Sequence, residues 1–516
     1  MLSYSYSAGL LGIDGFLVTV ECHSSKGMPS FEIVGLPDNA IKEAKERVRS
    51  AMSACSFQMP NQKIVVNLAP ADLKKEGSSF DLAILMSLIS STESALKNCK
   101  DLDECCFIGE LSLSGAVRSV RGALCMTLSA KNAGKKYMFV PEENVKEASA
   151  VDGIVVYGIK SATDIVDHFS GAKPLTPHTF VKEEHVAKTT YPDFKDVLGQ
   201  WVACRGAEIA AAGGHNMLLI GPPGTGKSMI AKRLPSILPE MTLEESLETT
   251  KIHSVAGILP EGVSLVNERP FRSPHHTMSA VSLAGGGKNP VPGEISLANN
   301  GVLFLDELPE FQRNVIDSLR QPLEDGKITI TRVASRVTYP SNFMLVCAMN
   351  PCKCGYFGHP TRECTCSQAD IRKYVSKVSG PLVDRMDMQI EVPAIDYKDL
   401  ANAEAGDSSA QIRERVNKAR EIMKKRFEGE LTDNGTPITC NAQMEPRHLR
   451  KYCKLNERGQ FLMEKAFVNL GLSARGHDRI LRVARTIADL AGSENIEANH
   501  LSEAIQYRGL DKKYFK

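Results

Sequence analysis

The sequence predicts an α/β protein of several domains, in which a parallel sheet with a phosphate-binding loop is followed by a helical region. Strand-like and helix-like segments alternate over residues 1–172 and again from Asp193 to about Pro393, as is typical of α/β domains. A glycine-rich stretch, GPPGTGKS, comes after a short apolar run in the second region. After about Ala394 the pattern is only helical.

The length of 516 residues is too great for a single hydrophobic core. We expect an N-terminal domain over 1–172, a nucleotide-binding core over 193–395 and a helical lid over 396–516. The segment 173–192 between the first two is polar and proline-rich (it lies within AKPLTPHTFVKEEHVAKTTYP), which predicts a linker.

The composition is that of an ordinary globular protein, with 42% hydrophobic and 24% charged residues. The net charge of +1 gives no overall field for a nucleic acid or a membrane, so such binding would need local patches. The N-terminus has no basic region before its apolar stretch, which Asp14 interrupts, and no uncharged apolar run reaches about 18 residues. We therefore expect a cytoplasmic protein with no membrane partner and with reduced thiols.

The N-terminal region contains recognisable strands and helices. FEIVGL, KIVVNLAP, YMFVP and GIVVYGI read as strands. DNAIKEAKERVRSAMSAC reads as an amphipathic helix capped by Asp38 or Asn39, and DLAILMSLIS as a more buried helix. This order predicts an α/β or α+β domain.

The segment NMLLIGPPGTGKSMIAKRL has the strand, loop and helix that a nucleotide-binding P-loop requires. In that interpretation Lys227 reaches the β- and γ-phosphates of ATP and Ser228 binds Mg²⁺. A coincidental glycine-rich turn is the alternative, and the correct flanking segments argue against it. The residues that match the motif are Gly221, Pro222, Pro223, Gly224, Thr225, Gly226, Lys227 and Ser228.

A second buried strand, GVLFLDEL, ends in two acids. After a P-loop, this pattern indicates that Asp306 holds the Mg²⁺ shell and that Glu307 polarises the attacking water. An acidic pair in a solvated turn is the alternative.

Two more residues lie where they could act on the nucleotide. Asn350 ends the apolar run FMLVCAMN and can position the attacking water, although it could simply form a turn. Arg385, in PLVDRMD, can stabilise transition-state charge on a neighbouring subunit's nucleotide. A surface ion pair with Asp384 or Asp387 is the alternative for this arginine.

Four of the 14 cysteines are concentrated in the loop 352–366, in two C-x-C pairs. Four thiolates can complete a tetrahedral zinc site, and His359 could replace one of them. The alternatives are a redox-active disulfide loop and unliganded thiols. The loop connects Asn350 to the turn of Arg385, so zinc there would couple the nucleotide state to the subunit interface. The predicted ligands are Cys352, Cys354, Cys364 and Cys366.

The strings GPPGTGKS, PGEISLANNGVLFLDELPEF, LVCAMNPCKCG and SGPLVDRMD occur in an order that resembles AAA+ ATPases of the magnesium-chelatase-like group, in particular their ComM/YifB branch. RPFRSPHHT and LSARGHDRILRVARTIADL extend the resemblance to nearly the whole chain. It implies a hexameric ring with ATP between subunits. By position Asn350 matches sensor 1, Arg385 the arginine finger and Arg475 sensor 2, with Arg482 as the other candidate for sensor 2.

The resemblance also implies a function on DNA, because members of this branch are implicated in branch migration, a helicase-like activity, during natural transformation. Related ring motors carry a pore hairpin, and KITITRVASRVTYPSNF predicts a hairpin of strands Ile328–Thr331 and Arg336–Tyr339. Arg332 and Arg336 would contact phosphates there. An ordinary surface hairpin is the alternative. A second candidate loop carries Arg272, His275, His276 and Lys288, although its two histidines could instead bind a metal or cap local backbone.

The N-terminal region resembles the Lon-protease-like fold, also described as ribosomal S5 domain 2-like, through GELSLSGAVRSVRGALCMTLSAKNAG and FVPEEN. Ser79 occupies the position of the nucleophile. A Ser–Lys dyad needs a lysine to take the hydroxyl proton, but Leu124 stands at the matching position and Lys131 lies about 10 Å further along a helix. We expect a proteolytically inactive domain used for assembly or substrate guidance.

Together these features predict an ATP-driven motor that remodels single-stranded or branched DNA in transformation or recombination. The alternatives are the motor subunit of a metal-chelatase-type complex, an ATP-dependent protease and a nucleotide-gated scaffold.

Overall fold

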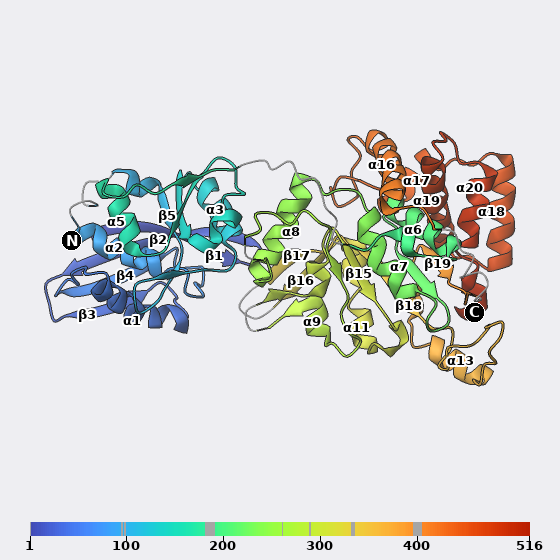
Figure 1. The fold of residues 1–516 in the computed structure, drawn as a ribbon, viewed down its shortest axis with the longest axis horizontal. Helices are drawn as coiled ribbons and strands as arrows, with labels where there is room; N and C mark the ends of the chain where they lie inside the picture. Colours follow the sequence, from blue (N-terminus) through green and yellow to red (C-terminus); the bar gives the residue numbers. More distant parts are fainter. Residues whose placement is uncertain are drawn as a thin grey trace.

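The structure is a computed structural model that describes residues 2–93, 96, 100–180, 191–260, 262–287, 290–331, 336–395 and 405–515. The molecule is elongated, with the N-terminal domain at one end, the helical lid at the other and the sheet of the nucleotide-binding core between them (Figure 1). In these described parts, no helix combines the length and the apolar character needed to cross a bilayer.

Two four-stranded sheets build the N-terminal domain, with strand orders β1-β2-β4-β3 and β10-β9-β8-β5, and β6 pairs with β7. The long hairpin of β1 and β2 was not anticipated from the sequence. It pairs Leu2 with His23 through to Leu11 with Asp14. The strands are β1 (Leu2–Leu11), β2 (Asp14–Ser25), β3 (Ser30–Val34), β4 (Lys63–Ala69), β5 (Cys105–Phe107), β6 (Glu110–Leu111), β7 (Val117–Arg118), β8 (Tyr137–Pro141), β9 (Val155–Ile159) and β10 (Pro177–His178).

The helices of this domain cover the two sheets. As predicted, Asp38 caps the first helix, where its carboxylate accepts a hydrogen bond of 2.9 Å from the Ile41 N–H. The last strand, β10, falls inside the predicted linker and pairs with β9, and residues 181–190 of that segment lie outside the described residues. The helices are α1 (Asn39–Ala54), α2 (Asp81–Thr92), α3 (Ala123–Asn132), α4 (Val145–Ala148) and α5 (Ala162–Ser170).

The nucleotide-binding core contains a five-stranded sheet of order β12-β15-β18-β11-β19, whose strand pairs are all parallel. β11, β15 and β18 are buried along their whole length, which explains their continuous apolar runs. The strands are β11 (Met217–Ile220), β12 (Phe271–Arg272), β15 (Val302–Leu305), β18 (Met344–Met349) and β19 (Met388–Glu391).

Helices surround this sheet, and two small hairpins extend from it. β13 (Gly285–Gly286) pairs with β14 (Val291–Pro292), and β16 (Lys327–Thr331) pairs with β17 (Arg336–Pro340). The helices are α6 (Trp201–Gly213), α7 (Lys227–Arg233), α8 (Leu243–Ala256), α9 (Ala280–Ala284), α10 (Glu294–Leu297), α11 (Arg313–Asp317), α12 (Arg320–Asp325), α13 (Gln368–Val375) and α14 (Gly380–Val383).

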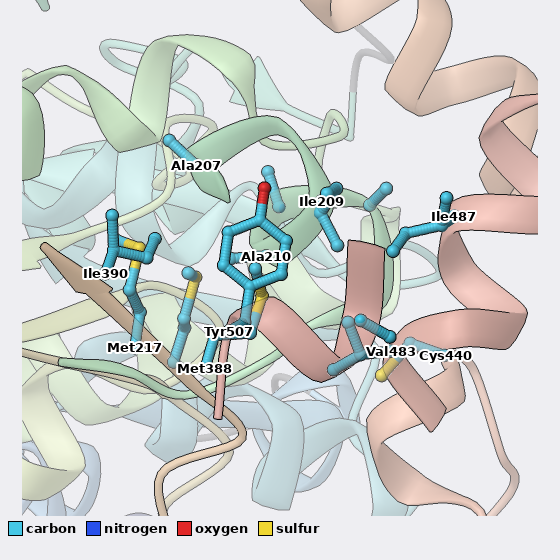
Figure 2. Packing of buried hydrophobic residues seen from close by; sticks show 14 of the residues in the cluster. Ala207, Ile209, Ala210, Met217, Met388, Ile390, Cys440, Val483, Ile487 and Tyr507 are labelled. Atoms are coloured by element: carbon cyan, nitrogen blue, oxygen red, sulfur yellow. The ribbon is translucent and has the colours of Figure 1, made fainter. Parts of the chain in front are cut away.

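The lid is helical, as predicted, and shares a core with the sheet. Met217 of β11, Met388 of β19 and Ala210 of α6 pack with Val483 and Ile487 of the lid in one buried cluster (Figure 2). The lid helices are α16 (Ser409–Arg426), α17 (Pro446–Tyr452), α18 (Glu457–Leu470), α19 (Ala474–Leu490) and α20 (Ala498–Gln506).

The N-terminal domain docks on helix α8 of the core, where α3 packs against it (Figure 1). The Ser254 hydroxyl of α8 donates a hydrogen bond to the Glu147 carboxylate. Leu247 packs on the N-terminal core cluster. A Cβ added at Gly257, which ends α8, would lie 2.7 Å from Arg121 Nε. These contacts join the two domains through buried polar and apolar groups.

Candidate nucleotide-binding site

The residues predicted to bind and cleave ATP lie directly after three neighbouring parallel strands. The P-loop comes after β11, Asp306 and Glu307 after β15, and Asn350 after β18, which lies between the other two. Because the carboxyl ends of parallel strands share one edge of the sheet, these side chains converge there. This edge is where open α/β sheets bind their ligands.

The P-loop closes around the amine of Lys227. Its Nζ donates hydrogen bonds of 2.7 Å to the carbonyls of Gly221 and Pro222. Gly226, at φ +88°, turns the loop into α7 in a conformation that favours glycine. Burial lowers the pKa of Lys227 to about 8, and the charge of Asp306 opposes that shift. A bound polyphosphate would supply negative charge that favours the protonated amine and raises this pKa.

Ser228 and Asp306 meet next to this lysine. The Ser228 hydroxyl donates a 2.6 Å hydrogen bond to Asp306 Oδ2, and Asp306 Oδ1 accepts one of 2.9 Å from the Glu307 N–H. A hydroxyl and a carboxylate are the hard oxygen ligands that Mg²⁺ prefers. The donor set therefore fits the predicted magnesium site.

Asn350 also reaches the P-loop. Its Oδ1 accepts a hydrogen bond of 3.2 Å from Lys227 Nζ. The side chain thus lies beside the group predicted to bind the γ-phosphate, as its assignment as sensor 1 requires. A residue that only formed a turn would not need this contact.

Glu307 has a partner that was not identified from the sequence. Its Oε2 lies 3.3 Å from Nδ1 of His276, in the loop after β12. From the sequence, His276 was placed in a candidate DNA loop, with metal binding and capping of local backbone as the alternatives. The contact depends on the sheet order, in which β12 lies beside β15 so that the ends of these strands are neighbours.

Arg385 lies near the opposite edge of the sheet. It precedes β19, its Nη1 donates a 2.7 Å hydrogen bond to the Pro381 carbonyl, and it forms an ion pair with Glu324. An ion pair was the expected alternative for this arginine, but with Asp384 or Asp387 as the partner. Asp387 is instead buried, where its Oδ2 accepts a hydrogen bond of 2.9 Å from the Asn216 N–H.

Arg475 lies on the same side of the molecule as Arg385. Both line a cavity of about 540 Å³, together with Arg482 and residues at the amino ends of the strands. The P-loop residues 221–228 are not among the residues that line it. Arg475 is exposed, whereas Arg482 Nε is buried and has no hydrogen-bond partner among the described residues. The predicted arginine finger and sensor 2 therefore share one surface, away from their own chain's P-loop.

The four cysteines of the loop 352–366 come together. The Sγ–Sγ separations are 3.3 Å for Cys352 and Cys354, 3.7 Å for Cys352 and Cys364, and 3.6 Å for Cys354 and Cys364. With Cys366, all four sulfur atoms lie within 4.8 Å of one another. This thiol set fits a tetrahedral zinc ion. The loop also touches the P-loop, since a Cβ at Gly355 would lie 2.7 Å from Cδ of Pro223.

The predicted hairpin is present as β16 and β17. Arg336 is exposed and pairs with Thr331, while Arg332 and Lys288 lie outside the described residues. The other face of the hairpin is apolar and packs into a core cluster through Ile328, Ile330 and Val337. The exposed Arg336 therefore lies on a hairpin whose other face is packed against the core.

In the N-terminal domain, Ser79 and Leu124 are both buried. Leu124 lies in α3, and its backbone N–H donates a 2.9 Å hydrogen bond to Glu147 Oε1. A leucine has no amine to take a proton from a serine, so this geometry fits the expected loss of protease activity.

These features define the class as an AAA+ P-loop ATPase. They are a P-loop after β11, two acids after β15, a strand between these two that ends in the predicted sensor Asn350, and a helical lid. Three magnesium-chelatase families match the chain: "Magnesium chelatase, subunit ChlI" over residues 193–400, "Subunit ChlI of Mg-chelatase" over 20–144 and "Magnesium chelatase, subunit ChlI C-terminal" over 406–508.

Two relatives that match this chain over nearly its full length identify the family within this class. The chain is 44% identical over 517 residues to Competence protein ComM of Haemophilus influenzae and 41% identical over 518 residues to the uncharacterized protein YifB of Escherichia coli. Both matches cover 99% of this chain and 98% of the relative. The chain belongs to the ComM/YifB family of magnesium-chelatase-like AAA+ ATPases. It is also 23% identical over 169 residues to Lon protease of Mycolicibacterium smegmatis, covering 31% of this chain and 21% of that protein, in keeping with the Lon-like fold.

Proposed function

We propose that this protein hydrolyses ATP between neighbouring copies of a hexameric ring and uses the cycle to remodel single-stranded or branched DNA. The observation that carries the proposal is the separation of the two halves of the site. Lys227 and Ser228 lie at the carboxyl edge of the sheet, while Arg385 and Arg475 line a cavity at its amino edge. The four residues of β11 alone span about 13 Å, so a chain cannot complete its own site.

Each residue at the carboxyl edge has a defined task in hydrolysis. Lys227 binds the β- and γ-phosphates, and Ser228 with Asp306 would hold Mg²⁺, which when bound neutralises phosphate charge. Glu307 takes a proton from the attacking water, whose oxygen bonds to the γ-phosphorus as the bond to the bridging oxygen breaks. Asn350 orients that water.

The neighbouring copy supplies the remaining positive charge. Arg385 must leave Glu324 to reach a neighbour's γ-phosphate, and the ion pair that it leaves is half exposed on the acid side. The Arg385 side chain itself is only 12% exposed, so a neighbour's phosphate must replace the charge of Glu324 as its partner. Arg475, already exposed, would contact the same nucleotide.

The DNA part of the proposal rests on three supports. The related Haemophilus protein is named for competence, Arg336 is exposed on an anchored hairpin, and the family resemblance implies branch migration. Phosphate contacts from such arginines would bind DNA without sequence preference.

We further propose that the loop 352–366 holds a structural zinc ion. The four sulfur atoms lie within 4.8 Å of one another, as the ligands of one ion must, and four thiolates can complete a tetrahedral zinc site. The ion would stiffen the loop that touches Pro223, and would thereby support the P-loop.

The decisive experiment measures ATP hydrolysis by the full chain with and without forked or single-stranded DNA, beside the Lys227→Ala protein. We expect DNA to raise the rate severalfold and Lys227→Ala to abolish it. Hydrolysis that DNA does not change would favour a metal-chelatase-type motor or a nucleotide-gated scaffold. A strand-displacement assay with Glu307→Gln as the inactive control separates a motor from a scaffold.

A further inference from the structure

The turn that carries Arg385, residues 385–387, is attached to the residue directly before the P-loop strand β11. That residue is Asn216, whose Nδ2 donates a hydrogen bond of 3.3 Å to the Arg385 carbonyl. Its Oδ1 accepts one of 2.8 Å from the Leu345 N–H, near the start of β18. Its backbone N–H donates to Asp387 Oδ2 and its carbonyl accepts from the Asp387 N–H, both at 2.9 Å. One asparagine therefore joins the Arg385 turn to β11 and β18.

Two arginines of the lid hold the next residue of the same turn. Arg479 of α19 and Arg508, just after α20, each donate a hydrogen bond from Nη1 to the Met386 carbonyl, at 3.2 and 2.6 Å. Arg479 Nε also lies 3.7 Å from Asp387 Oδ1. Both arginines are buried, and a buried charged group is costly unless it is paired and hydrogen-bonded. The lid is therefore tied to the backbone of the Arg385 turn.

The side chain of Arg385 is held less firmly than its backbone. Its guanidinium donates to the Pro381 carbonyl, four residues earlier in the chain, and pairs with Glu324, whose side chain is 53% exposed. Its Nε has no hydrogen-bond partner among the described residues. A catalytic group must be held within about 0.5 Å of its productive position by the residues that support it. For a side chain that has to change partners, this support can only come from the backbone of the turn.

We propose that Asn216 and Arg479 are positioning residues that hold Arg385 for catalysis on the neighbouring copy's nucleotide, Asn216 from the P-loop strand and Arg479 from the lid of their own chain. Because β11 leads directly into the P-loop, a shift of that strand when the chain binds its own ATP is carried through Asn216 to the turn. The nucleotide in one site is thereby linked to hydrolysis in the next. The inference rests on the proposed function, because it takes Arg385 as the arginine that acts on the neighbour.

Asn216→Ala is a selective test, because it removes the side-chain hydrogen bonds to the Arg385 carbonyl and the Leu345 N–H and leaves the backbone bonds to Asp387 in place. We expect kcat to fall by about ten- to a hundredfold, the cost of a small misplacement of a catalytic group. The Kd of a fluorescent ATP analogue should not change. Asn67→Ala, which removes an asparagine hydrogen bond in the N-terminal domain, is the matched control and should keep the parental kcat.

Arg479→Lys tests the attachment to the lid. Lysine keeps a positive charge beside Asp387 but lacks the planar fork of donors, and Arg508 still donates to the Met386 carbonyl. We expect kcat to fall by about tenfold, as the loss of one charge-assisted hydrogen bond allows, again with an unchanged Kd. A lowered Tm together with a parental kcat would show that Arg479 only stabilises the fold, and would overturn its positioning role.

Mixed rings show which half of the site Asn216 serves, since a residue beside β11 could instead support only its own P-loop. Asn216→Ala protein mixed with an equal amount of Lys227→Ala protein, which keeps an intact Arg385, should regain about a quarter of the parental rate. Mixed with Arg385→Ala protein, it should stay at or below its own residual rate.

The reverse pattern would assign Asn216 to its own P-loop and overturn the inference. So would a parental kcat in Asn216→Ala, or recovery in neither mixture when Lys227→Ala mixed with Arg385→Ala does recover. A parental rate in Arg385→Ala alone would refute the proposed role of Arg385 itself, so the two failures are told apart.

Discussion

Replacing Arg385 should destroy catalysis while leaving ATP binding intact. The P-loop and Arg385 lie beyond opposite ends of strands that are about 13 Å long, so Arg385→Ala removes nothing from its own chain's phosphate pocket. An arginine that stabilises phosphoryl transfer from a neighbouring subunit contributes about 10³-fold or more to kcat, which corresponds to about 4 kcal/mol. We therefore expect at least a thousandfold loss of hydrolysis and an unchanged Kd for a fluorescent ATP analogue.

Mixing two inactive proteins tests whether Arg385 acts on a neighbour. Lys227→Ala and Arg385→Ala proteins, mixed in equal amounts and allowed to exchange subunits, form some interfaces with an intact lysine from one copy and an intact arginine from the next. With random assembly each requirement is met half the time, so roughly a quarter of the interfaces and of the parental rate should return. A mixture of Lys227→Ala with the Lys227→Ala, Arg385→Ala double variant should stay inactive. If the first mixture is equally inactive although subunits exchange, Arg385 serves its own chain and the ring mechanism is wrong.

Three further predictions concern the pKa of a lysine, the cysteine loop and the N-terminal domain. Burial lowers the pKa of Lys227 to about 8, and a bound polyphosphate raises it, so ATP affinity should be constant at lower pH and fall above about pH 8, by up to about tenfold per pH unit. The Lys227→Arg protein, whose side chain stays charged, should lose this pH dependence in equilibrium titrations. An arginine variant with the same pH dependence would contradict the reasoning. Carefully reduced protein should contain about one zinc per chain by elemental analysis, and Cys354→Ser with Cys364→Ser should lose the metal and lower Tm; metal-free parent protein would refute the zinc site. Ser79→Ala should leave ATPase activity unchanged, and a casein-degrading activity in the parent that this substitution abolished would show that the Lon-like domain is not inactive.

The strands and the P-loop could be predicted from sequence because their signals are local. Apolar runs of four to six residues mark β11, β15 and β18, and the glycines and lysine of the motif define the loop that β11 leads into. The parallel arrangement then brings Asn350 within hydrogen-bond distance of Lys227. The β1–β2 hairpin was missed, since its first strand, LSYSYSAGLL, alternates small, polar and aromatic residues and was considered only as a secretion signal.

The partners of Arg385, Asp387 and His276 could not be predicted from the sequence, because they depend on packing between segments that are distant in the chain. Arg385 pairs with Glu324, 61 residues away in the chain, and not with the adjacent aspartates. Asp387 is buried where the core meets the lid, and His215 and Arg479 outweigh that burial and lower its pKa to about 2. The contact of His276 with Glu307 likewise requires the neighbouring positions of β12 and β15, which no local pattern specifies.

The docking of α3 on α8 has a mechanical consequence. The helix in which a Lon-type enzyme would present its lysine here presents Leu124, and it is fastened to the ATPase core through Glu147 and Ser254. The buried Glu147 also receives a hydrogen bond from Asn144, so sliding the two surfaces apart would strand a desolvated carboxyl group. A tilt of α8 that kept these contacts would move α3 and the rest of the N-terminal domain with it.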